Sequence, residues 1–157
     1  MYNTGGYDRV ETLGLLDGVV DVYMPDVKTL DAAAAARYLG APDYPAVVRA
    51  AIGEMHRQVG DLVVEGGVAT RGMLVRHLVM PGDAMRSGDV VRFLAREVSR
   101  DTYLNLMDQY RPCGEACHYP AIARPLAARE FDAALDTCRA EGLTRLDGHV
   151  GRRFRSR

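Results

Sequence analysis

The run Met73-Leu74-Val75-Arg76-His77-Leu78-Val79-Met80, followed by Pro81-Gly82, decides the fold class. The run is apolar apart from its two central residues, and it has the length of a β-strand rather than that of a helix. Pro81 and Gly82 end it, because both residues interrupt regular structure. The sequence therefore predicts a buried strand at this position, which is typical of the centre of a helix-covered sheet.

Outward from this strand, apolar periodicity predicts that strands and helices alternate along the chain. The other predicted strands are Gly18–Met24, Thr102–Met107 and a short segment Leu143–Leu146, with a hairpin of Asp61–Glu65 and Val68–Arg71 around Gly66-Gly67. The predicted helices are Arg9–Leu16, Ala32–Leu39, Pro45–Gln58, Ser87–Ser99 and Arg129–Glu141. Asp31 is a suitable N-cap and Gly40 a suitable stop for the second of these helices. Such alternation indicates an α/β fold with a parallel sheet, either open or rolled into a barrel.

Composition and charge exclude several classes of protein. The chain has 157 residues, of which 48% are apolar and 26% charged, so it is globular. A net charge of −1 gives no basic field for nucleic acid and no polybasic signal for membrane lipids. No apolar run approaches the ~20 residues that span a bilayer, and the chain does not begin like a secretion signal. We therefore expect one domain over residues 1–147, a disordered basic tail over 148–157, and a cytoplasmic protein.

Polar residues cluster where the predicted strands end. These residues are Asn3 and Thr4, Asp26 and Lys28, Arg76 and His77, and Asp108 to Tyr110. The carboxyl ends of parallel strands share one edge, where ligands bind in α/β proteins. Asp26 and Lys28 lie two residues apart on an extended segment, so both point the same way. The pair suits a zwitterion such as an amino-acid head group, or it is a simple ion pair that caps the strand.

Arg76 and His77 are neighbours inside an apolar strand, so alternation sends their side chains to opposite faces of the sheet. A charge in a core strand is costly unless it is paired or functional. We expect Arg76 to face the inner, ligand-binding side. We expect His77 to be a satisfied core histidine that packs against the outer helices.

The loop Cys113-Gly114-Glu115-Ala116-Cys117-His118 has two thiols and an imidazole that could bind zinc or iron. A fourth ligand is not obvious, because Cys138 falls within a predicted helix. Three cysteines are an odd number and do not form a disulfide framework. The favoured interpretation is a loop with incidental thiols and no metal site.

Several ordered segments together resemble the radical S-adenosylmethionine (SAM) superfamily, and within it proteins similar to pyruvate formate-lyase activating enzyme. The segments are 2–8, 20–28, 54–60, 71–82 and 105–112. The resemblance implies that the chain is the C-terminal portion of a partial, TIM-like (β/α)6 barrel that binds SAM and a [4Fe-4S] cluster. In complete proteins of this kind the reduced cluster cleaves SAM to a 5'-deoxyadenosyl radical, which abstracts hydrogen from a substrate.

The resemblance also implies which residues contact SAM. They are Asn3, Thr4 and Gly5 in the first loop, Asp26 and Lys28 after the next strand, Arg76, and Gln109, with Tyr110 as the alternative to Gln109. The family binds its cluster through a Cys-x3-Cys-x2-Cys loop that this sequence lacks. Cys113 and Cys117 have the first spacing, but Pro120 stands where the third cysteine would be, and the loop follows a late strand. The chain alone is therefore expected to be inactive in the radical step.

Two other functions remain open on the sequence. The chain could be a non-catalytic half-barrel that complements a separately encoded N-terminal half. It could also be a barrel enzyme that uses Lys28 as a Schiff-base amine. The expected partners are that N-terminal half or a glycyl-radical-type protein substrate.

Overall fold

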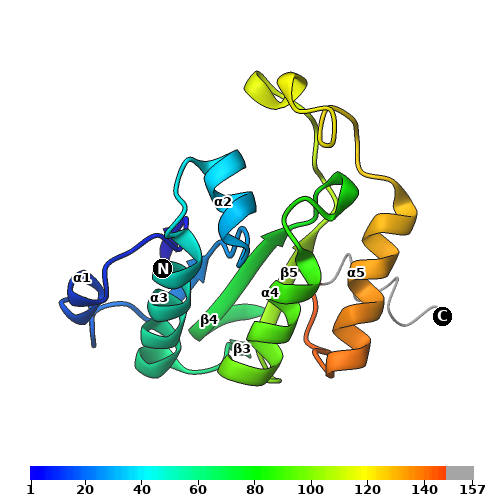
Figure 1. The fold of residues 1–157 in the computed structure, drawn as a ribbon. Helices are drawn as coiled ribbons and strands as arrows, with labels where there is room; N and C mark the ends of the chain where they lie inside the picture. The colour runs from blue at the N-terminus through cyan, green and yellow to red at the C-terminus, as the bar shows by residue number, and fades with distance from the viewer. Residues whose placement is uncertain (148–157) are drawn as a thin grey trace.

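A parallel β-sheet organises residues 1–147, the part of the chain that the computed structural model describes (Figure 1). The predicted basic tail, 148–157, lies outside the described residues. The parallel strands are β1 (Tyr2–Thr4), β2 (Val22–Pro25), β4 (Val68–Leu78) and β5 (Tyr103–Met107). They stand side by side in the order β1-β2-β4-β5, and a single bridge from Leu104 to Leu146 extends the far edge. The predicted α/β fold with a largely parallel sheet is confirmed.

Strands that neighbour each other in space thus follow each other along the chain. Right-handed crossovers between parallel strands in such an order send the intervening helices to one face of the sheet. The helices are α1 (Val10–Gly14), α2 (Ala32–Leu39), α3 (Tyr44–Val59), α4 (Ser87–Phe93) and α5 (Ala128–Glu141). A π-helical turn, η2 (Leu94–Val98), continues α4, and η1 (Pro81–Asp83) and η3 (Gly114–His118) are 3-10 turns. Among the described helices, none is long and apolar enough to cross a membrane.

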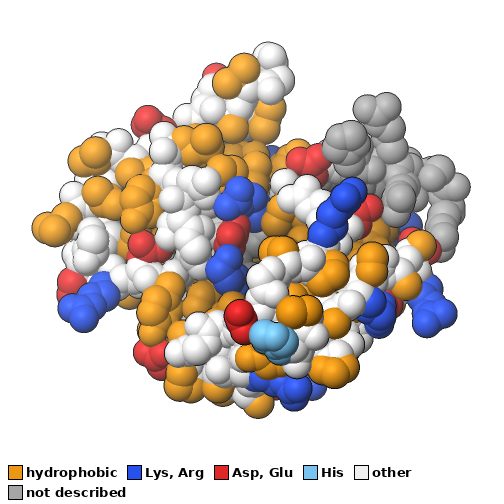
Figure 2. Space-filling model, turned by 90° about the horizontal axis from the view of Figure 1, so that it is seen from above, with side chains coloured by type: hydrophobic (Ala, Val, Ile, Leu, Met, Phe, Trp, Pro, Cys, Tyr) orange, Lys and Arg blue, Asp and Glu red, His pale blue; other side chains and the backbone are white. Residues whose placement is uncertain are grey.

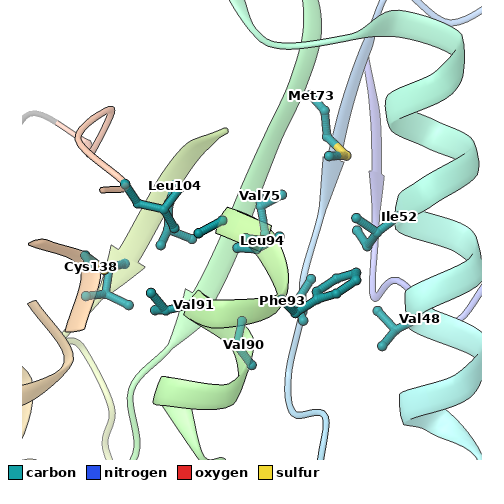
Figure 3. Close-up of a cluster of buried hydrophobic side chains, with 14 of the residues drawn as sticks. Val48, Ile52, Met73, Val75, Val90, Val91, Phe93, Leu94, Leu104 and Cys138 are labelled. Carbon is teal, nitrogen blue, oxygen red and sulfur yellow. The ribbon is translucent and has the colours of Figure 1, made fainter. Parts of the chain in front are cut away.

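The main core lies between this helical layer and the sheet (Figure 3). Val48 and Ile52 of α3 face Met73 and Val75 of β4, and Leu94 packs beside them. Alternate residues of β4 are fully buried on this side, whereas Leu74, Arg76 and Leu78 on the other side are half-buried. The sheet therefore has one face sealed by helices and one face that is more open to a ligand.

Local sequence signals explain where several helices begin and end. The Asp31 carboxylate accepts a hydrogen bond of 2.7 Å from the Ala34 amide, and Gly40 ends α2 in the left-handed conformation, as predicted. Pro45 lies in the first turn of α3. These signals mark where α2 begins and ends and where α3 begins.

Several element boundaries differ from the prediction. β4 runs without a break from Val68 to Leu78, so the second hairpin strand and the core strand are one element. Gly72 makes this possible, because its φ is +105° and a Cβ there would lie 2.3 Å from the Asp61 carbonyl oxygen. The strand predicted from Gly18 starts only at Val22, and the helix predicted from Arg9 to Leu16 covers only Val10–Gly14. The strand predicted over Leu143–Leu146 is reduced to the Leu146 bridge.

The segment that joins β5 to α5, residues 108–127, rises above the carboxyl edge of the sheet (Figure 1). It is tied to α2 by Tyr119, whose ring packs edge-on against Tyr38 with 5.4 Å between ring centroids. Beneath it a second, smaller core forms around Met80, Met85 and Ile122. This segment therefore covers part of the edge at which the strands end.

Candidate functional site

Some of the polar residues predicted at the ends of β1, β2 and β4 meet in one cluster. Asp26 lies beside Arg76 through a parallel bridge, and the Arg76 Nε donates to Asp26 Oδ1 at 2.7 Å. The Arg76 Nη2 donates to Asn3 Oδ1 at 2.9 Å. Three neighbouring strand ends thus contribute one side chain each, and the sheet register sets their spacing. We call Asn3, Asp26, Lys28 and Arg76 the strand-end cluster.

Lys28 completes the cluster from the segment after β2. Its Nζ lies 3.0 Å from Asp26 Oδ2, so the two oxygens of the carboxylate contact different cations. The Lys28 side chain is 42% exposed and can take a further acceptor. Two cations and one carboxylate give the cluster a net positive charge. Such a set can bind a ligand carboxylate through Lys28 and Arg76 while Asp26 and Asn3 accept from a ligand ammonium.

A cavity of about 170 Å³ adjoins the cluster. Asp26, Lys28 and Arg76 form its polar side, and its apolar side consists of Val27, Leu39, Leu78, Met80, Met85 and Met107. Figure 2 shows the molecule from above, where oppositely charged side chains lie side by side near the centre, between hydrophobic ones. The cavity is smaller than the 300–1,000 Å³ usual for a whole ligand. It suits a short aliphatic or thioether group that carries a charged end.

Other predicted site residues lie differently. The Thr4 hydroxyl donates to Asp8 and accepts from the Gly6 amide at 3.2 Å, so it is turned away from Arg76. Gly5 presents its carbonyl to Tyr44. Gln109 is exposed and its amide donates to the Met107 sulfur at 3.5 Å, beside the cavity wall. The structure therefore brings Asn3, Asp26, Lys28 and Arg76 together and leaves Thr4 and Gln109 outside that cluster.

His77 is buried on the helix-covered face, as predicted. One ring nitrogen lies 2.7 Å from the Val27 carbonyl oxygen and the other 2.9 Å from the Ser87 hydroxyl. Burial lowers the pKa of His77, so the ring is neutral near pH 7. The His77 ring thus connects Val27, which follows Asp26, to Ser87 at the start of α4. Arg76 points to the opposite face of the sheet, as predicted.

Tyr44 is a residue of this region that the sequence did not single out. Its phenol oxygen contacts the backbone of Gly5, Asp26 and Lys28 at 2.9, 3.0 and 3.0 Å. Burial raises its pKa to about 12. The apolar cavity wall was missed as well, because Leu39 and Met85 come from segments whose placement depends on the tertiary fold. In the sequence, Tyr44 stands out only as part of the Asp-Tyr-Pro start of α3. That motif predicts the beginning of a helix, but it does not predict the contacts of the Tyr44 hydroxyl.

The three cysteines do not belong to a metal-binding group of side chains within residues 1–147. Cys113 and Cys117 are exposed and Cys138 is buried in α5, where burial raises its pKa to about 12. Within residues 1–147, no three histidine, cysteine or acidic side chains are grouped so that they could hold a metal ion. His118 instead contacts Glu115 at 2.7 Å. The residues described therefore do not fit a [4Fe-4S] cluster.

Sequence comparison finds a relative of this chain among the archaea. An uncharacterized protein of Methanocaldococcus jannaschii is 30% identical over 137 residues, which are 87% of this chain and 36% of the relative. The chain thus spans about a third of that relative's length. No family model matches the chain, and no solved structure matches it.

Proposed function

We propose that the chain forms the C-terminal part of a radical SAM barrel similar to that of pyruvate formate-lyase activating enzyme. The observation that carries the proposal is the strand-end cluster at the carboxyl ends of three adjacent parallel strands. In this proposal the cluster binds the amino-acid part of SAM. When bound, SAM supplies the hydrogen-abstracting radical chemistry of the family.

The topology supports a barrel of the (β/α)6, TIM-like type. Strands in sequential order with helices on one face are the arrangement from which βα-barrels are built, and their ligands bind at the carboxyl ends. In such a barrel the open face of β4, with Leu74, Arg76 and Leu78, would line the interior. The sealed face with His77 would be the helix-covered outside.

The donor set of the cluster suits the methionine part of SAM. Lys28 and Arg76 provide cations for its carboxylate, and Asp26 with Asn3 provides oxygens for its ammonium. The cavity of about 170 Å³ has room for the aliphatic chain that ends in the sulfonium, and Met80, Met85 and Met107 are among its lining residues. The adenosine part would extend over the open face of the sheet.

A SAM-binding assay tests this proposal directly. We expect the chain to bind SAM in equilibrium dialysis, and Arg76→Met to weaken binding at least tenfold because a hydrogen bond between charged groups is lost. Glu97→Gln is the matched control, since it removes one partner of an exposed ion pair with Arg49 on the helical layer. No binding by the unaltered chain, or equal affinities for both variants, would overturn the proposal.

The iron-sulfur cluster belongs to a part of the site that the described residues do not provide. We therefore propose that the chain alone is inactive in the radical step, and that it acts with a segment that carries the cluster. After anaerobic reconstitution we expect less than one iron per four chains, unchanged by Cys113→Ser with Cys117→Ser. Four irons per chain that disappear in this double variant would contradict the proposal.

A second candidate is a non-catalytic half-barrel that pairs with a separately encoded N-terminal half. It is favoured by the outer edge of β1, which pairs with no strand among residues 1–147, and by large exposed apolar side chains within the first twenty residues. These side chains are Met1, Tyr7, Val10, Leu15 and Val19, with exposed fractions of 80, 50, 40, 81 and 70%. Unpaired edges and exposed apolar patches favour association. A monodisperse monomer in light scattering, with SAM bound, would count against this candidate.

A further inference from the structure

We propose that Tyr44 is a positioning residue whose buried phenol holds two loops of the SAM site in register. The inference rests on the proposed function, because it assigns a role at the same site. Tyr44 is the first residue of α3 and is only 3% exposed. Its hydroxyl forms hydrogen bonds with three backbone groups, which belong to two separate segments of the described chain.

The phenol lies where the pairing of β1 with β2 stops. The Asp26 amide still donates to the Thr4 carbonyl at 2.9 Å, which is the last hydrogen bond between the two segments. Gly6 then turns away with a φ of +74°, and its amide donates to the Thr4 hydroxyl instead. The Asp26 carbonyl would consequently lack the amide partner that a continued strand would provide. The Tyr44 hydroxyl takes that amide's place at 3.0 Å.

The Tyr44 hydroxyl couples the loop after β1 to the end of β2 because it can donate and accept hydrogen bonds at the same time. A tyrosine hydroxyl has one proton to donate and two lone pairs with which to accept. The Lys28 amide donates to it at 3.0 Å, and its single proton is shared between the Gly5 and the Asp26 carbonyl oxygens, at 2.9 and 3.0 Å. One hydroxyl thus serves both the loop after β1 and the end of β2. Phenylalanine at this position could serve neither.

The backbone groups held in this way carry the ligand-binding side chains. Asp26 and Lys28 are two residues apart, and their side chains meet at 3.0 Å on the open side while their backbones contact Tyr44. The Tyr7 ring stacks on the Tyr44 ring with 5.7 Å between centroids and 19° between planes, which adds a contact from the first loop. Fixing a site before the ligand arrives improves affinity, since less freedom is lost on binding.

The test compares Tyr44→Phe with Tyr23→Phe. Tyr23 is also fully buried, and its hydroxyl donates to Gln58 Oε1 at 2.7 Å, away from the strand-end cluster. SAM affinity is measured by equilibrium dialysis, and the hydrogen exchange of the Lys28 amide by NMR. We expect Tyr44→Phe to weaken SAM binding about tenfold and to speed exchange of that amide at least tenfold. We expect Tyr23→Phe to change neither by more than twofold.

The outcomes separate the inference from the proposed function. If the unaltered chain does not bind SAM, the proposed function fails, and the role of Tyr44 in binding fails with it. If the unaltered chain binds SAM and Tyr44→Phe binds equally well, the proposed function stands and the inference is wrong. Replacing Tyr44 by 4-aminophenylalanine, which keeps a polar donor at the same place, is expected to retain affinity within threefold. A loss as large as that of Tyr44→Phe would overturn the inference, and this variant also serves if Tyr44→Phe does not fold.

Discussion

Replacing Asp26 by asparagine should destabilise the fold through the two cations that the carboxylate holds. The change keeps the shape of the side chain but removes the charge between the Arg76 Nε, at 2.7 Å, and the Lys28 Nζ, at 3.0 Å. The Asp26 and Arg76 side chains are 23 and 25% exposed, so water screens this pair only in part. Hydrogen bonds to charged groups contribute about 1.5–3 kcal/mol, and exposed ion pairs about 0–1 kcal/mol.

These magnitudes give an expected loss of about 2 kcal/mol in the free energy of unfolding, mostly from the Arg76 contact. For a chain of this size the melting temperature should fall by about 4–8 °C. Urea denaturation followed by circular dichroism measures the free energy, and a thermal scan measures the shift. A double-mutant cycle of Asp26→Asn with Arg76→Met isolates the coupling between the two side chains.

The matched control for this experiment is Glu97→Gln, which removes the same charge from an exposed pair. Glu97 and Arg49 have side chains that are 58 and 40% exposed, so this change should cost less than about 1 kcal/mol. If Asp26→Asn is no more destabilising than Glu97→Gln, or if the cycle shows no coupling, then the strand-end cluster does not stabilise the fold as argued.

Three further predictions concern single residues. Hydrogen bonds from Arg124 and from two backbone amides lower the pKa of Glu130. The ionised Glu130 carboxylate therefore stabilises the fold above pH ~4, and this stabilisation is lost as the pH falls through the lowered pKa. The difference in unfolding free energy between the unaltered chain and Glu130→Gln should consequently shrink in acid. Burial lowers the pKa of His77, so stability should decline below pH ~6.5 by at most about 1.4 kcal/mol per pH unit, and less so in His77→Gln. Gly40→Ala should cost about 1–2 kcal/mol for its left-handed conformation alone. Gly6→Ala should lower the free energy of unfolding by clearly more, because its Cβ would also lie 2.4 Å from the Asp26 carbonyl oxygen. Urea denaturation measures both variants, and equal losses would contradict the clash.

The sequence predicts those features that depend on neighbours along the chain. Alternation alone places Arg76 and His77 on opposite faces, and the structure confirms both positions. Spacing of two residues brings the Asp26 and Lys28 side chains together at 3.0 Å. Because parallel strands share a carboxyl edge, the same reasoning brings Asn3 to Arg76 across the sheet.

Features that depend on tertiary contacts are missed. The role of Tyr44 depends on three backbone groups that are distant from it in sequence, so no local pattern predicts it. The sequence predicts one strand that ends at Arg71 and another that begins at Met73, whereas the close approach of the Asp61 backbone at Gly72 lets one long strand continue. The end of the helix predicted over Ser87–Ser99 is a π-helical turn, whose extra residue per turn cannot be read from apolar spacing.

The sequential order of β1, β2, β4 and β5 also bears on how such a protein changes over evolutionary time. Each of these parallel strands pairs with the one before it in the chain, so strand–helix units follow the same order in the gene and in space. A strand–helix unit added by duplication at the β1 edge would leave every existing pairing and crossover in place. Lineages built on this plan can therefore differ in length by whole units while the chemistry at the remaining strand ends is inherited intact.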